Sequence, residues 1–291
     1  MFDRVTIVNV DGRAGELHET QLALHYSAMQ MPGARCLLLS PTKPKQLLSP
    51  IEHIAIAPMG HLEYSLFVTY ALHEFIETDY ALIVQNDGWV LNGASFSKDF
   101  LEFDYIGAPC HIADVITNSA HSYIKRFLWV AQEARHELGV KINYTMNGGF
   151  SLRSKKFLKT PSLLGLDYRL RPPQAQRSRQ GEYQMKWPNG EAAEDVYHCI
   201  INRAAMDDAG IRFAPLCAAV KFAFEHLNPI LHGQMDVSKV FGHHAVFRRL
   251  ASLDPLTIQC IWPEHEVRSV MMEPEVIAIF EKLGYKVKFT A

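Results

Sequence analysis

The chain has 291 residues, of which 48% are hydrophobic and 21% are charged, proportions close to those of an average globular protein. They exclude a disordered or collagen-like chain, because enough apolar material is present to form a core. Its 29 basic and 31 acidic residues give a net charge of −2. This balance argues against a nucleic-acid-binding protein, which needs a basic surface to displace counterions from phosphates.

The first 85 residues alternate between short apolar runs and longer amphipathic stretches. The strands are rich in Val, Ile and Leu, as expected for strands that are buried on both faces of a mostly parallel sheet. We expect an α/β protein with helices on either side of this sheet. The predicted strands are residues 5–10, 35–39, 52–57 and 78–85, and the predicted helices are residues 16–29 and 62–76.

The alternation is looser after residue 100. Residues 105–109, 150–152 and 212–224 predict strands, and residues 122–138, 194–209 and 275–283 predict helices. The segment 169–190 has three prolines and five basic side chains without periodicity, which predicts a long mobile loop. The basic residues there are typical either of a solvated loop or of a lid that closes over a diphosphate. No repeat or linker interrupts the chain, so we expect a single domain over residues 1–291.

The five cysteines are odd in number and widely spaced, and no C-x-x-C pair is present. This pattern predicts neither a disulfide framework nor a zinc ribbon, and it favours the reducing cytoplasm. The first residues lack the basic region and long apolar run of a signal peptide. No run of about 18 apolar residues occurs, so the sequence predicts no transmembrane segment.

Three short polar motifs are candidates for chemistry. Gln85-Asn86-Asp87-Gly88 follows the most apolar strand, where open α/β sheets bind ligands, although Asn-Asp-Gly is also typical of a turn. Glu194-Asp195 offers a pair of carboxylates, one of which is suited to act as a general base, although acids at a helix start also stabilise its dipole. Asn147-Gly148-Gly149 allows a ligand to approach the backbone closely, or simply forms a turn.

Gly242-His243-His244 is a fourth candidate, because a single imidazole suits Mn²⁺ or a phosphate, although neighbouring histidines are more often packing or surface residues. Other enzyme signatures are missing from the sequence. It contains no G-x-G-x-x-G, no P-loop, no G-x-S-x-G and no H-E-x-x-H. Dinucleotide-dependent oxidoreductases, P-loop kinases, serine hydrolases and zinc proteases are therefore disfavoured.

In their order along the chain, these motifs resemble one family. The matching pieces are Tyr64-Ser65, Thr78-Asp79-Tyr80, Gln85 to Asn92, Phe103 to Pro109, Asn147 to Arg153, Glu194-Asp195-Val196 and Arg212 to Pro215. Together they resemble the DUF5672 family of bacterial proteins, which is similar to the GT-A class of glycosyltransferases. The resemblance covers residues from about 60 to about 245, and the order of the pieces carries it more than any single piece.

The resemblance implies a GT-A-like, Rossmann-like domain. Its nucleotide-binding half would span about residues 1–110, its acceptor and catalytic half about 111–250, and a C-terminal extension 251–291. Gln85-Asn86-Asp87 would stand at the D-x-D position of such enzymes and keeps only the last carboxylate. The residues implied to bind the donor are Val8, Asn9, Asp11, Gln85, Asn86, Asp87, Asn147, Gly148 and Gly149.

The resemblance also implies roles in catalysis. Asp195 would be the base that takes the proton from the acceptor hydroxyl in an inverting enzyme, and Glu194 would hold sugar or acceptor hydroxyls. A retaining enzyme would use the same pair differently. Asp87 and His244 would bind a divalent cation, Mn²⁺ or Mg²⁺, that neutralises the leaving diphosphate. His243 is an alternative to His244, and the incomplete acidic triplet leaves the need for a metal open.

The expected function is therefore the transfer of a sugar from a nucleotide-sugar donor, foremost a UDP-sugar, to a hydroxyl acceptor in surface-polysaccharide synthesis. The acceptor would be a glycan or a lipid-linked glycan, the latter placing a cytoplasmic protein at the inner face of the membrane. We expect no nucleic-acid partner, and a homodimer is compatible with the sequence. The alternatives are a non-catalytic nucleotide- or glycan-binding protein on a decayed GT-A fold and a metal-dependent nucleotidyltransferase.

Overall fold

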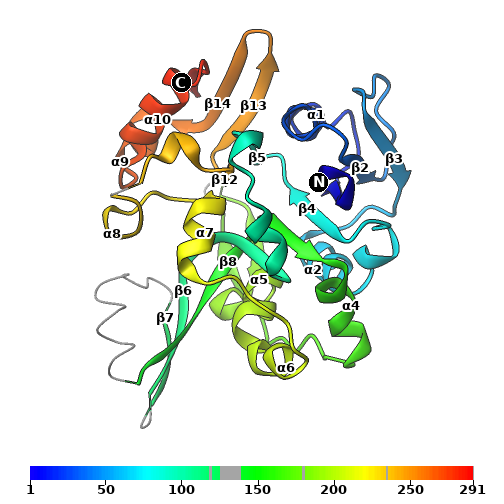
Figure 1. Cartoon of the computed structure of the whole chain (residues 1–291), viewed down its shortest axis with the longest axis vertical. Coiled ribbons are helices and arrows are strands. Elements are labelled where there is room, and N and C mark those ends of the chain that lie inside the picture. The colour runs from blue at the N-terminus through cyan, green and yellow to red at the C-terminus, as the bar shows by residue number, and fades with distance from the viewer. Residues whose placement is uncertain (118–119, 125–138, 179–180, 234, 291) are drawn as a thin grey trace.

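The computed structural model describes residues 1–117, 120–124, 139–178, 181–233 and 235–290 (Figure 1). Its centre is a seven-stranded sheet with the strand order β3-β2-β1-β4-β8-β6-β7. Helices pack against this sheet, as an α/β architecture requires to cover its apolar faces. Two smaller sheets, β11-β12-β5 and β13-β14-β15, lie beside it.

The first half of the central sheet is parallel, as the sequence predicts. β2 pairs with β1 and β3, and β1 pairs with β4, all in parallel. Every residue of β1 and β4 is buried, which is the reason that these strands are apolar throughout. The elements of this half are β1 (Val5–Val10), α1 (His18–Gln30), β2 (Arg35–Ser40), β3 (Ile51–Ala55), α2 (His61–Tyr70) and β4 (Tyr80–Val84).

The second half of the sheet reverses direction. β8 (Lys141–Ser154) is antiparallel to both β4 and β6 (Tyr105–Ile116), and β7 (His121–Ile124) is antiparallel to β6. Five strands therefore run in one direction and β7 and β8 in the other, so the sheet is mostly parallel. The reversal was not expected, and it places the residues before Phe150 beyond the carboxyl end of β4, because Val84 pairs with Phe150.

Two of the predicted strands are much longer than expected. β6 has 12 residues and β8 has 14, because the two strands pair along most of their lengths. Asn147-Gly148-Gly149 consequently lies within β8 and not in a turn before it. The prediction of a helix over 122–138 is wrong for its first three residues, which belong to β7; residues 125–138 lie outside the described part of the chain.

The predicted strand over 212–224 is also wrong, since most of it forms the helix α7 (Leu216–Phe222), followed by the two-residue strand β11 (Ala223–Phe224). Pro215 occupies the N-cap position of this helix. A short apolar run has no periodicity that separates a strand from a buried helix, which explains the error.

Segment 169–190 is not entirely a loop. It contains an antiparallel hairpin formed by β9 (Gln174–Arg177) and β10 (Tyr183–Lys186), and every residue of both strands is exposed. The helix predicted over 194–209 is divided into α5 (Glu194–Val196), a π-helical turn (Tyr197–Ile201) and α6 (Arg203–Asp208). A π-helical turn inserts an extra residue into a helix and is frequent at functional sites.

The C-terminal residues form a third sheet beside the central one. It consists of β13 (Arg248–Leu253), β14 (Leu256–Pro263) and β15 (Lys286–Thr290), joined by α9 (Glu264–Ser269) and α10 (Glu273–Lys282). The helix α10 confirms the prediction for residues 275–283. α1 packs against β13, and Tyr285, just before β15, accepts a hydrogen bond of 3.1 Å from the indole of Trp89 in β5.

A small ribbon, β5 (Gly88–Val90) paired with β12 (Gly242–His244), connects the central and C-terminal sheets. The remaining helices are α4 (Lys155–Leu163) and α8 (Pro229–His232). Short 3₁₀ turns occur at Phe2–Arg4, Leu72–Glu74, Gly93–Ser95, Lys98–Glu102, Pro188–Gly190 and Val237–Lys239.

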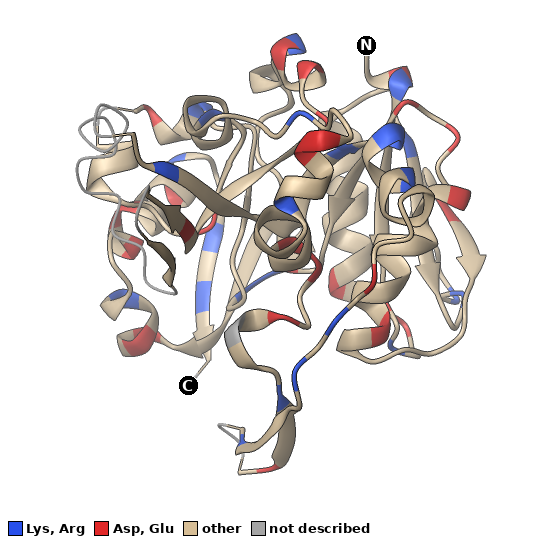
Figure 2. Cartoon of the chain, turned by 90° about the horizontal axis from the view of Figure 1, so that it is seen from below, with Lys and Arg blue, Asp and Glu red and all other residues tan. Residues whose placement is uncertain are grey.

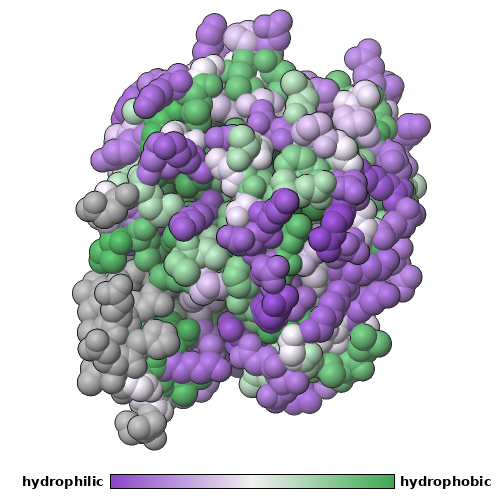
Figure 3. Space-filling view, viewed as in Figure 1, coloured by the Kyte–Doolittle hydropathy of each residue, from purple (hydrophilic) through white to green (hydrophobic). Residues whose placement is uncertain are grey.

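The surface is mixed in charge and polarity. Acidic and basic residues are interspersed along the ribbon (Figure 2). Hydrophilic residues cover much of the face in Figure 3, most densely on the side where α1, β3 and α2 lie in Figure 1. Among the described residues, no helix combines the length and the apolar character needed to cross a bilayer.

Candidate functional site

A pocket of about 270 Å³ lies at the carboxyl ends of β1 and β4. In open α/β sheets, this is the edge where ligands bind, because the strand ends and the loops that follow them leave a crevice. The residues that line the pocket include Asn9, Asp11, Arg13, His61, Tyr64, Gln85, Asn86 and Arg249.

The first wall of the pocket is the turn after β1. Asp11 is buried and accepts two hydrogen bonds from the Arg13 guanidinium, at 2.9 and 2.7 Å, and one from the Thr20 hydroxyl at 2.9 Å. Burial opposes the charge on Asp11, but the contacts with Arg13 hold the pKa of that carboxyl below its usual range. Asp11 thus carries a fixed negative charge that orients Arg13 at the pocket rim.

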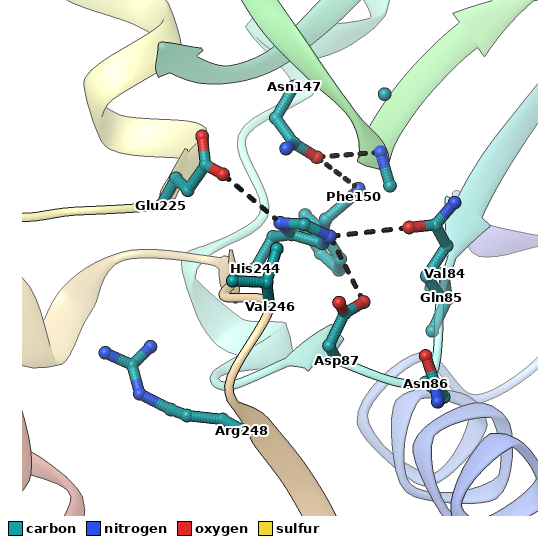
Figure 4. A network of polar contacts seen from close by, with 12 residues as sticks. Val84, Gln85, Asn86, Asp87, Asn147, Phe150, Glu225, His244, Val246 and Arg248 are labelled. Carbon is teal, nitrogen blue, oxygen red and sulfur yellow. Dashed lines mark hydrogen bonds and ion pairs between the residues drawn. The ribbon is translucent and has the colours of Figure 1, made fainter. Parts of the chain in front are cut away.

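The second wall is the turn between β4 and β5, which carries Asp87. Gly88 pairs with His244 across the β5–β12 ribbon, and a side chain at Gly88 would collide with the backbone of this partner strand. The lack of a side chain therefore lets the ribbon close. As a result, Asp87 Oδ1 lies 3.1 Å from His244 Nε2, although the two residues are far apart in sequence (Figure 4).

His244 is surrounded by hydrogen-bond acceptors. Its Nε2 atom faces Asp87 and, at 3.4 Å, the side-chain oxygen of Gln85, and its Nδ1 atom faces Glu225 Oε1 at 3.8 Å (Figure 4). An imidazole with acceptors at both nitrogens is suited to the doubly protonated form. Burial alone would lower the pKa of His244, but Asp87 and Glu225 raise it to about 10. The imidazolium in turn lowers the pKa of Glu225 to about 2, despite the burial of that carboxyl.

Arg249 is a second basic side chain beside Asp87. Its Nη1 atom lies 3.5 Å from Asp87 Oδ2, so the two carboxylate oxygens of Asp87 face one cation each. Burial opposes ionisation of Asp87, but His244 and Arg249 together lower the pKa of its carboxyl. Glu19 also belongs to this network, because its Oε2 atom lies 3.7 Å from Arg249 Nε and accepts a hydrogen bond from Asn86.

The floor of the site is the middle of β8. Gly149 lies directly against Gln85 and His244, and a side chain at this position would overlap both of them. The backbone N–H of Gln85 donates to the carbonyl of Gly149 at 2.9 Å. Asn147 shapes the strand here, because its side-chain oxygen accepts from the N–H groups of Gly149 and Phe150 at 2.7 and 3.2 Å.

Glu194 lies at the start of α5 and forms an ion pair with Arg153 of β8. The guanidinium of Arg153 is fully buried and donates to Glu194 Oε1 at 2.9 Å and to the Gly148 carbonyl at 3.3 Å. It also lies over the ring of Tyr105, 5.0 Å from its centroid. Arg153 therefore fixes the Glu194 carboxylate against the floor of the site.

Asp195 differs from its neighbour, because no basic side chain pairs with it among the described residues. One oxygen accepts the N–H of Val196 at 2.7 Å. Burial raises the pKa of Asp195 to about 7, and the negative charges of Glu194 and Glu225 add to this effect. A carboxyl with a pKa near neutrality exchanges protons readily at physiological pH, which is the property of a general base.

The structure brings most of the predicted site residues together. Asn9, Asp11, Gln85 and Asn86 line the pocket, and Asp87, Gly149 and His244 contact the lining residues Gln85 or Arg249. Asn147, Gly148, Glu194 and Asp195 follow along β8 and at the start of α5, and none of them lines the pocket. Val8 is a correction: its side chain is fully buried in the apolar core and does not line the pocket. His243 points away from the site, with its ring 4.1 Å from that of Trp89, which resolves the choice between the two histidines.

Arg153, Glu225 and Arg249 contact predicted site residues and were not predicted themselves. Arg153 closes one of the motifs but had no assigned role, and the other two lie in segments without a motif. Each acts through a partner more than 40 positions away or on another strand, so no local pattern marks them.

The predicted cation site does not fit the residues present. Asp87 and His244 are adjacent as expected, but each is paired with a charged protein group. Metal ligation needs a free imidazole lone pair, and the doubly protonated imidazole that Asp87 and Glu225 favour has none. Within the described ranges, no cluster of three or more His, Cys, Asp or Glu side chains has an arrangement that could hold a metal ion. We therefore derive no step through a metal.

Three comparisons place the chain among known proteins. A solved structure, described as a mannose-1-phosphate geranyltransferase from Thermus thermophilus, is similar at 12% identity and a TM-score of 0.29. The similarity covers 53% of this chain and 58% of that one, so the chain matches just over half of that protein's length. No curated protein matches. The family model described as "Protein of unknown function (DUF5672)" matches residues 60–244, and the chain belongs to this family.

Proposed function

We propose that the protein is a glycosyltransferase that moves a sugar from a nucleotide-sugar donor to a hydroxyl group of an acceptor. The observation that carries this proposal is the convergence of polar motifs on one edge of the sheet. The ends of β1 and β4 line the pocket, and the glycines of β8, the start of α5 and the end of β12, all distant in sequence, follow it in a chain of direct contacts that begins at Gln85. Such a site combines a ligand crevice with a proton acceptor.

The pocket supplies the donor side of this reaction. Asn9 is buried and its side-chain oxygen has no hydrogen-bond partner in the described part of the chain. It lines the pocket together with Asp11 and Gln85, so amide and carboxylate groups are available to hydroxyl groups of a ribose or sugar. Gly149 lets the side chains of Gln85 and His244 pack directly against the backbone of β8 beside the pocket.

Asp195 acts as the general base in this proposal. A hydroxyl attacks the anomeric carbon of the donor sugar, the bond from that carbon to the diphosphate oxygen breaks, and Asp195 takes the hydroxyl proton. Its raised pKa matches this role, because a base with a pKa near 7 is ionised in part at neutral pH and binds the proton strongly. Glu194 is held in place by Arg153 and offers its carboxylate to hydroxyl groups of the sugar or acceptor, beside the base and distinct from it.

The test is a panel of nucleotide sugars incubated with the full chain, with release of the nucleoside diphosphate as the signal. Slow hydrolysis of the correct donor gives a signal even before the acceptor is known. We expect one nucleotide sugar to release its diphosphate and Asp195→Asn to abolish the acceptor-dependent increase. If nucleotides bind but none is turned over with any acceptor, the non-catalytic binding protein considered from the sequence replaces the transferase.

A further inference from the structure

Arg249 is held rigidly at the mouth of the pocket. It is the second residue of β13, and its side chain is only 14% exposed. Its Nη1 atom donates to the backbone carbonyls of Val246 and Arg248 at 3.0 and 2.8 Å and lies 3.5 Å from Asp87. Its Nε atom lies 3.7 Å from Glu19. These contacts fix the plane of the guanidinium before any ligand arrives.

One edge of this guanidinium remains available. In the described part of the chain, Nη2 of Arg249 makes no hydrogen bond, and the side chain lines the pocket together with Asn9 and Gln85. This donor is not among the buried atoms that lack a partner, so solvent reaches it and a ligand can replace that solvent. A fixed guanidinium with an unused donor beside a pocket is therefore a site for an acceptor group of a ligand.

A second arginine lines the same pocket. Arg13 donates to Asp11 through Nε and Nη2, which leaves its Nη1 atom without a described partner. Its side chain is 60% exposed, so it is free to adjust to a ligand. Arg249 and Arg13 come from different parts of the chain, the start of β13 and the turn after β1, and both reach the pocket where a donor nucleotide would lie.

The arrangement around Asp87 explains why these cations are needed. A carboxylate beside a diphosphate repels it unless a positive charge intervenes. In GT-A-like enzymes with a D-x-D motif, a divalent cation would supply that charge. Here both oxygens of Asp87 already face cationic side chains, His244 at 3.1 Å and Arg249 at 3.5 Å. A basic side chain or an imidazole thus lies within 3.5 Å of each oxygen of this carboxylate.

On the basis of the proposed function, we propose that Arg249, assisted by Arg13, binds the diphosphate of the donor and stabilises its charge as it leaves, in place of a divalent cation. Guanidinium groups suit this role because their planar forks match two phosphate oxygens at once and their charge is permanent. Asp87 then has a positioning role, since it holds Arg249 and His244 on the side of the leaving group.

The experiment measures binding of UDP, GDP, ADP, CDP and inorganic pyrophosphate to the full chain by calorimetry, once with EDTA and once with Mn²⁺. We expect the preferred diphosphate to bind in EDTA with an affinity that Mn²⁺ changes less than threefold. Arg249→Gln should weaken binding at least tenfold, and Arg13→Gln at least threefold. Arg268→Gln is the matched control, because that arginine is exposed, pairs with Glu264 and lies away from the pocket.

The outcomes separate this inference from the proposed function. Binding that requires Mn²⁺ overturns the inference and leaves the transferase intact. Unchanged affinity in both Arg249→Gln and Arg13→Gln also overturns it. If no diphosphate binds with or without metal, the proposed function fails as well. Arg13→Gln keeps the test valid should Arg249→Gln fold poorly, since Arg13 is 60% exposed and the amide of glutamine can still donate to Asp11.

Discussion

The site contains two acidic clusters that are organised in opposite ways. Around Asp87, every negative charge faces a cation: His244 and Arg249 pair with Asp87, and His244 also faces Glu225. At the start of α5, two carboxyl groups are adjacent and only Glu194 has a cationic partner, Arg153, among the described residues. Each carboxylate of the first cluster has a cationic partner, whereas Asp195 of the second cluster has none among the described residues.

This difference in pairing indicates which cluster binds the charge of a ligand and which cluster transfers protons. Paired groups have pKa values displaced from neutrality, as the values of about 10 for His244 and about 2 for Glu225 show. They keep their charges across the physiological range and provide a constant electrostatic field. Asp195, with a pKa raised to about 7, is the group at this site whose charge changes near neutral pH.

The strongest test of this division is Asp195→Asn. The amide keeps the size and the hydrogen bond to Val196 but accepts no proton, so we expect turnover to fall by about 10²- to 10⁴-fold, the usual contribution of a general base. Binding of the donor should change less than threefold. Steady-state kinetics and calorimetry measure the two effects, with Asp208→Asn, at an exposed position of α6, as the control. Turnover equal to wild type would remove Asp195 from the base role.

Arg153→Met tests whether the second cluster depends on its single cation. The substitution leaves the buried Glu194 carboxylate unpaired beside Asp195, and breaking a buried ion pair in this way costs about 3–5 kcal/mol of stability. The double variant Arg153→Met/Glu194→Gln should recover part of that loss, because it removes the orphaned charge. Urea denaturation measures both. A single variant as stable as wild type would show that the pair does not hold the cluster together.

Gly149→Ala adds a methyl group to β8 where this strand contacts Gln85 and His244. The new methyl group would overlap the side chains of Gln85 and His244, and overpacking of this kind costs about 1–3 kcal/mol. We expect weaker donor binding together with a lower thermal midpoint. Differential scanning fluorimetry with and without the preferred diphosphate measures both, and an unchanged affinity would mean that the donor does not reach β8.

The pH dependence of kcat/KM tests which of the two clusters moves protons, and it has the smallest expected effect. Because Asp195 must be ionised to accept a proton, kcat/KM should rise about tenfold per pH unit below about 7 and level off above it. His244 and Glu225 should add no step between pH 5 and 8, since their pKa values lie outside this range. A profile that is flat from pH 5 to 8 would contradict the assignment.

The raised pKa of Asp195 also makes the stability of the folded protein depend on pH. The folded protein holds the Asp195 proton up to about pH 7, whereas the unfolded chain releases it near the ordinary aspartate pKa of 3.8. The stabilisation by this group is therefore complete below about pH 4 and is lost as the pH rises through 7. Asp195→Asn should remove this component of the pH dependence, which urea titrations at pH 5 and 8 would detect as a difference from wild type.

The sequence alone predicted the parallel half of the sheet and the family. The strands of this half are buried on both faces, so their apolar runs are continuous and easily recognised. The donor-side residues Asn9, Asp11 and Gln85 follow directly, since they come at or immediately after the ends of these strands. Val8 was wrongly included, because it lies before the strand end and its side chain is buried in the core.

Only the tertiary structure determines which charged groups of the site are paired with one another. The reversed direction of β8 places Gly149 beside Gln85 and His244, and the pairing of β5 with β12 joins Asp87 to His244. Side-chain pKa values and metal fit follow from such contacts, which in the case of Gln85 and His244 link residues 159 positions apart. Local propensity carries no information about them, because an ion pair depends on the distance between two groups and not on the sequence around either one.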